Sequence, residues 1–170
     1  MYYRIIEHMV RTLHCIGFLI LLTTLGPHPV AAQLNKVPIE ELTDSMRLHP
    51  KPALILLTAD WCAYCHLQRA QLKKSTKLQR MMATVYFSEV DTEMRQTLVF
   101  NGKTYRFLPT GVGTGSHELA FALGAIDNRL ALPTWIVLNE HFEIIFKFAG
   151  VIKTDELLGL LETIHRPPLP

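Results

Sequence analysis

The chain has 170 residues, of which 49% are hydrophobic, so it is long enough to bury one core of ordinary size. Its 17 Lys and Arg residues nearly balance 15 Asp and Glu residues, and the formal net charge of +2 excludes a strong electrostatic field for nucleic acid or a membrane surface. The composition therefore favours one globular domain that meets protein surfaces or small molecules of low charge.

Residues 1–32 have the pattern of an export signal. Basic residues precede an apolar run at 15–25, and the small residues at 30–32 are typical of a cleavage site. Because the apolar run is shorter than the roughly 18 residues of a transmembrane helix, we expect cleavage and a periplasmic or secreted protein. The alternative is an uncleaved membrane anchor, since no Asp, Glu, Lys or Arg occurs at 12–35. Residues 33–170 then form the domain.

The first elements of that domain predict a covered sheet. Apolar residues near helical spacing, with Pro38 at the start, predict a short amphipathic helix within 36–51. Residues 52–59 form an almost continuous apolar run, which is typical of a strand buried on both faces. A parallel or mixed sheet with helices on both sides is therefore expected.

A helical pattern follows from Ala63 to about Lys73, and Ser75 is expected to cap a further short helix. Residues 84–91 then predict a second strand. Four basic residues recur at helical spacing after residue 65, and their pattern favours a solvated face: Arg69, Lys73, Lys77 and Arg80.

Residues 92–131 are the least regular part of the chain. Asn101-Gly102 lies between β-prone flanks and predicts a hairpin over 97–107, outside the main sheet. Residues 108–115 are expected to form a loop, after which Ser116 caps a helix. This region carries too much apolar surface for a solvated loop, so we expect it to fold.

The last part of the chain predicts two strands and a helix. Residues 132–150 form two β-prone runs joined at 139–142, and Thr154 begins a helix. The apolar face of that helix consists of Leu157, Leu158, Leu161 and Ile164. A strand-helix-strand half thus precedes a strand-strand-helix half, which is an α/β fold.

Cys62 and Cys65 are the thiols that remain after cleavage, because Cys15 lies in the export signal. A bridge between cysteines so close in sequence constrains the unfolded chain little, so the spacing favours chemistry over a structural role. At a strand-to-helix junction, Cys62 lies where free amides and the helix dipole favour a thiolate. A Cys62 thiolate would attack a partner's disulfide, and Cys65 would resolve the product.

Other interpretations of the same motif stay open. Cys62-Ala-Tyr-Cys65-His66 is also the attachment signature of c-type haem, with His66 as an axial ligand. A zinc site would need a ligand beyond these three residues, and we expect neither a metal nor a cofactor. A third alternative is a binding module in which the cysteines form an inert bridge.

The segment at 59–65, ADWCAYC, resembles the active site of the thioredoxin superfamily, and Leu132-Pro133-Thr134 resembles its cis-proline segment. Residues 146–164 are similar to its closing strand, glycine turn and final helix. The resemblance covers about 38–165 apart from the insertion at about 92–131. It implies the thioredoxin fold, with a central mixed sheet flanked by helices and an inserted hairpin and helix before the cis-proline. The amino-acid sequence of the motif is most similar to that of secreted or periplasmic members, including the C-terminal domain of the transmembrane thiol:disulfide interchange reductase.

The resemblance implies a thiol:disulfide oxidoreductase in which Cys62 is the nucleophile and Cys65 resolves the mixed disulfide. It also implies that the two cysteines form a disulfide with each other. It makes Pro133 the cis residue of the catalytic site. We expect substrate contacts from four further residues: Trp61, Tyr64, Leu132 and Thr134. The expected partners are protein disulfides or dithiols and a membrane or periplasmic redox partner, with no nucleic acid. The dipeptide between the cysteines lacks the His of strongly oxidising relatives, which favours a reductant or disulfide carrier.

Two departures from the family pattern affect the mechanism. Leu56 stands where cytoplasmic thioredoxins bury an Asp that accepts the proton of the resolving thiol, so Cys65 needs another route, such as water or Glu89. The insertion returns immediately before Leu132, so we expect its end to lie near the dithiol. It either covers an edge of the sheet or forms one wall of the substrate groove.

Overall fold

The computed structural model describes residues 34–164. The expected export signal at 1–32 lies outside the described residues, so its cleavage, and the alternative of a membrane anchor, stay predictions. Within 34–164, none of the helices combines the length and the apolar character that a membrane-spanning helix requires.

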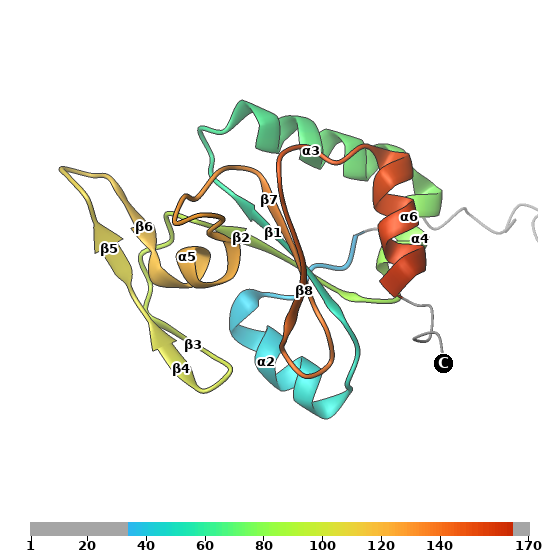
Figure 1. Ribbon diagram of the computed structural model, residues 1–170, viewed down its shortest axis with the longest axis horizontal. Coiled ribbons are helices and arrows are strands. Elements are labelled where there is room, and N and C mark those ends of the chain that lie inside the picture. Colours follow the sequence, from blue (N-terminus) through green and yellow to red (C-terminus); the bar gives the residue numbers. More distant parts are fainter. Residues whose placement is uncertain (1–33, 165–170) are drawn as a thin grey trace, which may run out of the picture. The chain divides into compact units, whose positions relative to one another are not determined.

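A four-stranded mixed sheet lies at the centre of the fold, with the strand order β2-β1-β7-β8 (Figure 1). Strand β1 (Ala53–Thr58) pairs in parallel with β2 (Tyr86–Asp91) and antiparallel with β7 (Thr134–Leu138). Strand β8 (Ile144–Ala149) pairs antiparallel with β7 and forms one edge. All six residues of β1 are buried, so the strand that the apolar run predicts is confirmed, as is the α/β fold.

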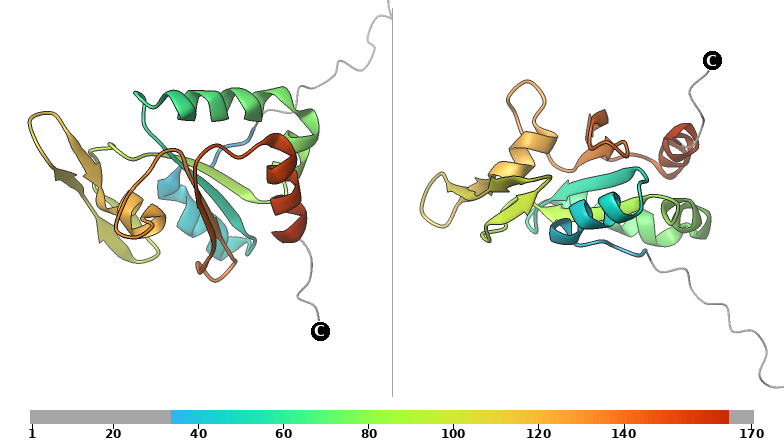
Figure 2. Two further views of the ribbon diagram at one scale, coloured as in Figure 1. Left: turned by 45° about the horizontal axis from the view of Figure 1, so that its top comes forward. Right: turned by 90° about the horizontal axis from the view of Figure 1, so that it is seen from below.

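Helices cover both faces of the sheet (Figures 1 and 2). Helices α2 (Ile39–Leu48) and α5 (Glu118–Gly124) lie on one face, and their core includes Ile55 and Leu57 of β1. The alternate side chains of β1, Leu54 and Leu56, enter a second core on the opposite face. Three helices cover that second face: α3 (Ala63–Lys74), α4 (Thr76–Met82) and α6 (Thr154–Ile164).

Side chains at the helix starts explain where these helices begin. The Leu78 backbone N–H donates to Ser75 Oγ at 3.2 Å, so Ser75 caps α4 as expected. Ser75 has extended dihedrals, which separates α4 from α3. Because the helix is interrupted there, the four basic residues do not form one continuous stripe. Arg69 pairs with Glu89 on β2 and lies partly buried, so the prediction of a solvated face is wrong for Arg69.

The insertion contains two hairpins. Strands β3 (Leu98–Phe100) and β4 (Lys103–Tyr105) pair around Asn101 and Gly102, whose φ angles are 45° and 77°. Positive φ at both turn positions is what Asn-Gly favours, so this predicted hairpin is confirmed.

The prediction of a loop at 108–115 is wrong, because strands β5 (Phe107–Pro109) and β6 (Gly115–His117) pair there as a second hairpin. Their sequences are short and include Pro109 and Gly115, so they carry little of the β-prone pattern by which a strand is predicted.

The cap of α5 also differs from the prediction. Ser116 lies in β6 opposite Leu108, so it does not cap the helix. The Leu119 N–H instead donates to His117 Nδ1 at 3.2 Å, and His117 Nε2 donates to the Gln96 carbonyl oxygen at 3.1 Å. His117 is fully buried, and its two ring nitrogens join α5 to the segment after β2.

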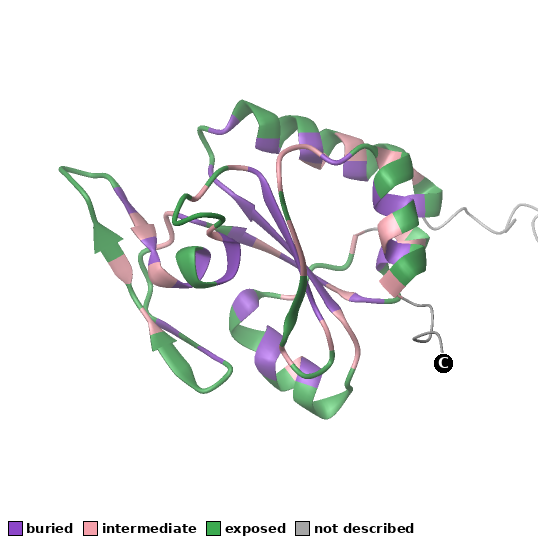
Figure 3. Cartoon of the chain, viewed as in Figure 1, coloured by how far each residue is buried: buried purple, intermediate pink, exposed green. Residues whose placement is uncertain are grey.

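The insertion folds onto the body of the domain, as expected. Figure 3 shows buried residues in α5 and exposed ones along much of the hairpins. Five of its apolar side chains belong to the core that α2 and the sheet share: Leu98, Phe100, Leu119, Ala120 and Leu123. The insertion is therefore part of the hydrophobic core on this face.

Gln68 makes buried hydrogen bonds on the face of the sheet that α3, α4 and α6 cover. Its side chain is fully buried in α3, and its Oε1 accepts from the Ile152 N–H at 2.8 Å and from Trp135 Nε1 at 3.3 Å. Its Nε2 donates to the Ile152 carbonyl oxygen at 3.2 Å. One amide thus joins the cysteine-bearing helix to β7 and to the turn before α6.

Candidate functional site

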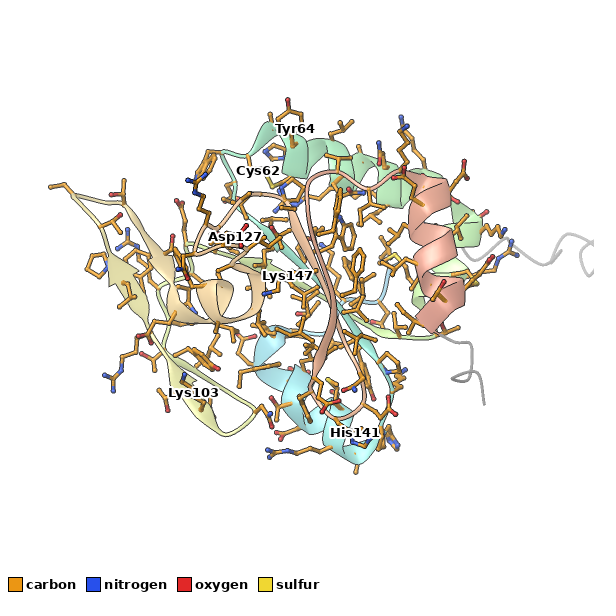
Figure 4. The ribbon with its side chains drawn as sticks, viewed as in Figure 1. Cys62, Tyr64, Lys103, Asp127, His141 and Lys147 are labelled. Atoms are coloured by element: carbon orange, nitrogen blue, oxygen red, sulfur yellow. A yellow bond between two sulfur atoms is a disulfide. The ribbon has the colours of Figure 1, made fainter. Side chains whose placement is uncertain are left out.

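Cys62 and Cys65 lie where β1 ends and α3 begins, and Figure 4 labels Cys62 at this place. Their sulfurs form a disulfide, with the Cα atoms 5.2 Å apart. Cys62 is the N-cap residue of α3, and its Sγ accepts from the Cys65 N–H at 3.1 Å. The Cys65 N–H and the positive end of the helix dipole also favour a thiolate on Cys62 once the bridge is reduced.

The two cysteines differ in exposure in the order that the sequence predicts. Cys62 is 4% exposed and Cys65 is fully buried. The more exposed residue is therefore Cys62, as a nucleophilic role for it requires. The division of labour between nucleophile and resolving thiol remains a prediction.

The peptide bond between Leu132 and Pro133 is cis, as expected. The Gly150 N–H donates to the Pro133 carbonyl oxygen at 2.8 Å, which joins this segment to the end of β8. The Leu132 side chain packs against the cluster formed by Ala59 and the two cysteines. Residues far apart in sequence therefore meet at the disulfide.

The other expected substrate contacts occupy different environments. Trp61 and Tyr64 are 70% and 67% exposed, and Tyr64 points away from the ribbon (Figure 4). Thr134 is fully buried, and its hydroxyl donates to the Ala131 carbonyl oxygen at 2.6 Å. That bond fixes the turn that contains Pro133. Substrate contact by each of these residues stays a prediction.

Glu93 belongs to the site, although its sequence pattern does not single it out. Trp61 Nε1 donates to Glu93 Oε1 at 3.0 Å, which holds the exposed indole in place. Glu93 could have been found from the predicted topology, because β1 and β2 are parallel and their carboxyl ends meet at one edge of the sheet. Trp61 and Glu93 both follow those ends closely.

Glu89 lies on β2 opposite Leu56, with its side chain 9% exposed. Burial would raise the pKa of its carboxyl group, but hydrogen bonds and positive charge from Lys36 and Arg69 lower that pKa below its ordinary value. Arg69 Nη2 also donates to Thr58 Oγ1 at 3.0 Å. A lowered pKa makes the Glu89 carboxylate a weaker proton acceptor.

His66, the third residue of the alternative haem motif, is exposed on α3. Its Nε2 donates to the Asp60 carbonyl oxygen at 2.7 Å, a contact that joins the first turn of α3 to the loop before it. Within residues 34–164, no three His, Cys, Asp or Glu side chains are grouped so that they could hold a metal ion.

Comparison with known proteins supports the fold. A family model described as a thioredoxin-like domain matches residues 39–165. A mutant thioredoxin from Halobacterium salinarum is similar in structure, with a TM-score of 0.53 and 18% identity over 80% of this chain and 95% of that one. A structure named DsbH oxidoreductase has a TM-score of 0.52 and 14% identity, covering 84% of this chain and 92% of that one.

A curated relative matches a smaller part of the chain. The cytoplasmic tRNA 2-thiolation protein 1 of Kluyveromyces lactis is 30% identical over 93 residues, which are 52% of this chain and 25% of that protein. The chain therefore spans about a quarter of that relative's length.

Proposed function

Since the chain belongs to the thioredoxin-like family and is a thioredoxin-like oxidoreductase with a Cys62–Cys65 pair, we propose that it is an exported enzyme that reduces or carries protein disulfides. The observation that carries this proposal is the placement of the disulfide at the N-terminus of α3, packed against the segment of the cis-proline.

The reaction is a two-electron exchange. The Cys62 thiolate attacks one sulfur of the substrate disulfide, forms a mixed disulfide and releases the first substrate thiolate, which takes a proton from water. Cys65 loses its proton to water, and its thiolate attacks Cys62 Sγ. The second substrate thiolate leaves, and the Cys62–Cys65 disulfide forms. A dithiol protein then reduces this disulfide and restores the pair of thiols.

Two features of the sequence support the finer parts of the proposal. The pattern at 1–32 supports export, and a membrane or periplasmic dithiol protein is the partner that such a location requires. The dipeptide Ala63-Tyr64 contains no His to stabilise the thiolate, which supports a reductant or carrier over a strong oxidant. On this proposal the reduction potential lies below about −200 mV, which equilibration in glutathione buffers measures.

The test of the proposed mechanism uses alkylation and two matched variants. In the reduced protein near neutral pH, iodoacetamide is expected to modify Cys62 before Cys65, which peptide mass mapping detects. Cys65→Ser is expected to accumulate mixed disulfides on Cys62 with a protein disulfide substrate, whereas Cys62→Ser forms none. Absence of turnover in the parent protein, with both thiols free, would show that the bridge is inert. A Soret band in protein made in a host that attaches c-type haem would instead support the haem interpretation.

A further inference from the structure

A pocket of about 380 Å³ lies beside the disulfide. Two of its walls come from the site itself, namely Trp61, which precedes Cys62, and Leu132, which packs against both cysteines. Other lining residues belong to the insertion and include Phe121 of α5 and Leu130. The pocket therefore borders the residue before Cys62 and the residue that packs against both cysteines.

Hydrogen bonds hold the insertion wall against the site. The His117 N–H at the start of α5 donates to the Thr92 carbonyl oxygen at 2.7 Å, just beyond the end of β2. On the other side of the same segment, Glu93 accepts from the Trp61 indole. Residues 92 and 93 thus fix both the insertion and the tryptophan, so the pocket is largely preformed.

The size and polarity of the pocket limit what it can receive. Its volume is at the low end of the range of about 300 to 1,000 Å³ for ligand sites, which suits one large side chain. Apolar side chains from the site and from the insertion line the pocket, and Glu93 is the one charged residue of the lining. An acidic rim disfavours anionic disulfides such as oxidised glutathione and favours a peptide that carries positive charge.

We propose that this pocket is the specificity pocket of the enzyme and receives a large apolar side chain next to the reacting half-cystine of a protein disulfide, with a basic residue at its Glu93 rim. The inference rests on the proposed function and adds the class of protein disulfide that reacts best. Phe121 and Leu130 act as specificity-determining residues, since they contact the flanking side chain and not the reacting sulfurs.

The test measures single-turnover rates with pre-reduced protein freed of reductant. Three peptide disulfides differ at one position each: a parent peptide with Lys-Cys-Phe, one with Ala in place of Phe, and one with Glu in place of Lys. The neutral compound hydroxyethyl disulfide reports the reactivity of Cys62 without a flanking side chain. The protein is expected to reduce the Phe peptide at least about fivefold faster than the Ala peptide.

Two variants test whether the preference for the Phe peptide over the Ala peptide comes from the pocket. Phe121 is 43% exposed, so Phe121→Ala is expected to keep the fold, as near-UV circular dichroism will show, and to bring the Phe-to-Ala rate ratio close to one. Phe148→Ala is the matched control, because Phe148 is 42% exposed on β8 and lines a different pocket. It is expected to keep the parent ratio and to reduce hydroxyethyl disulfide at the parent rate, and the rate of Phe121→Ala with the same compound is used to normalise its peptide rates.

Glu93→Gln tests the charge separately, because the amide oxygen can still accept from Trp61. It is expected to reduce the preference for Lys over Glu peptides about threefold or more while the Phe-to-Ala ratio is unchanged.

Three results would overturn the inference. A folded Phe121→Ala variant that keeps the parent's Phe-to-Ala ratio would show that the pocket does not select substrates. A parent protein that reduces hydroxyethyl disulfide, and reduces all three peptides at equal rates, would also show that the pocket does not select substrates. The proposed function would then still stand. A parent protein that reduces none of the disulfides would overturn both proposals together.

Discussion

Single residues in this protein connect distant elements through polar side-chain contacts. Gln68 joins α3 to β7 and to the turn before α6, and Arg69 turns from the same helix toward Glu89 on β2. Lys36 reaches the same carboxylate from the segment before α2. These neighbours fix the orientation of α3, and therefore of Cys65, relative to the sheet.

The Glu89 carboxylate is expected to make stability depend on pH. Its pKa in the folded protein lies below the ordinary value of 4.5, so its stabilising contribution is present above that pH and is lost as the pH falls through the folded pKa. At neutral pH, Glu89→Gln is expected to lower the free energy of unfolding by about 1 to 2 kcal/mol. Urea unfolding measured across the acidic range should show this difference between parent and variant shrinking below the ordinary pKa.

The control for this experiment is Glu162→Gln, which changes an exposed glutamate on α6 and should alter stability little. If the difference caused by Glu89→Gln is the same at every pH, the ionised carboxylate does not contribute in the way the contacts with Lys36 and Arg69 imply.

At the scale of elements, helix α5 is positioned by a close approach to β1. The cap at its start depends on His117, and Gly124 at its end lies against Leu57. A Cβ at position 124 would lie 2.2 Å from Leu57 Cδ1 and 3.2 Å from Leu130 Cδ1. The glycine is needed for this close contact, and the position of the pocket wall follows from it.

A pair of helical glycines tests that contact. Gly124→Ala is expected to lower the free energy of unfolding by about 1 to 3 kcal/mol, because the added methyl group overpacks a buried region. Gly159→Ala in α6 adds the same methyl group where no atom lies within 4 Å, so it should be neutral or stabilise by up to about 1 kcal/mol. Urea unfolding compares the two, and equal stability of the variants would contradict the close packing of α5.

At the scale of the whole molecule, the insertion has two roles. Its buried side chains complete the core on the face of the sheet that α2 covers, while exposed Phe121 lines the pocket beside the disulfide. The sequence offered two alternatives, cover for an edge of the sheet or a wall of the substrate groove, and the packing places the insertion's buried side chains in the core on one face of the sheet. Its structural role is seen directly in the packing, and its role in substrate selection is the subject of the proposal above.

Replacing residues 97–129 with a tight turn is therefore expected to destroy cooperative folding. The change removes five buried apolar residues and exposes the side chains of Ile55 and Leu57 to water. Near-UV circular dichroism and urea unfolding measure the loss, and Val99→Ser, at an exposed position of the same insertion, should remain folded. A truncated chain with the parent's urea midpoint would show that the insertion is dispensable for the core.

The sequence by itself determined the features that depend on neighbouring residues. The apolar run of β1, the Ser75 cap, the Asn101-Gly102 turn and the Cys62–Cys65 motif are all local signals, because backbone propensity and capping act within a few positions. The motif also placed the candidate site at the end of a strand, and together with the cis-proline segment it indicated the thioredoxin fold.

Only the tertiary structure decided which distant side chains meet. Trp61 and Glu93 are 32 positions apart, and Arg69 and Glu89 are 20 apart, so the contacts depend on the register of β1 and β2. The second hairpin, the His117 cap and the pocket between Phe121 and Leu132 depend likewise on how the insertion packs against the sheet. Burial and long-range hydrogen bonds outweigh weak local preferences in these places, because a buried polar group must find its partner wherever the fold places it.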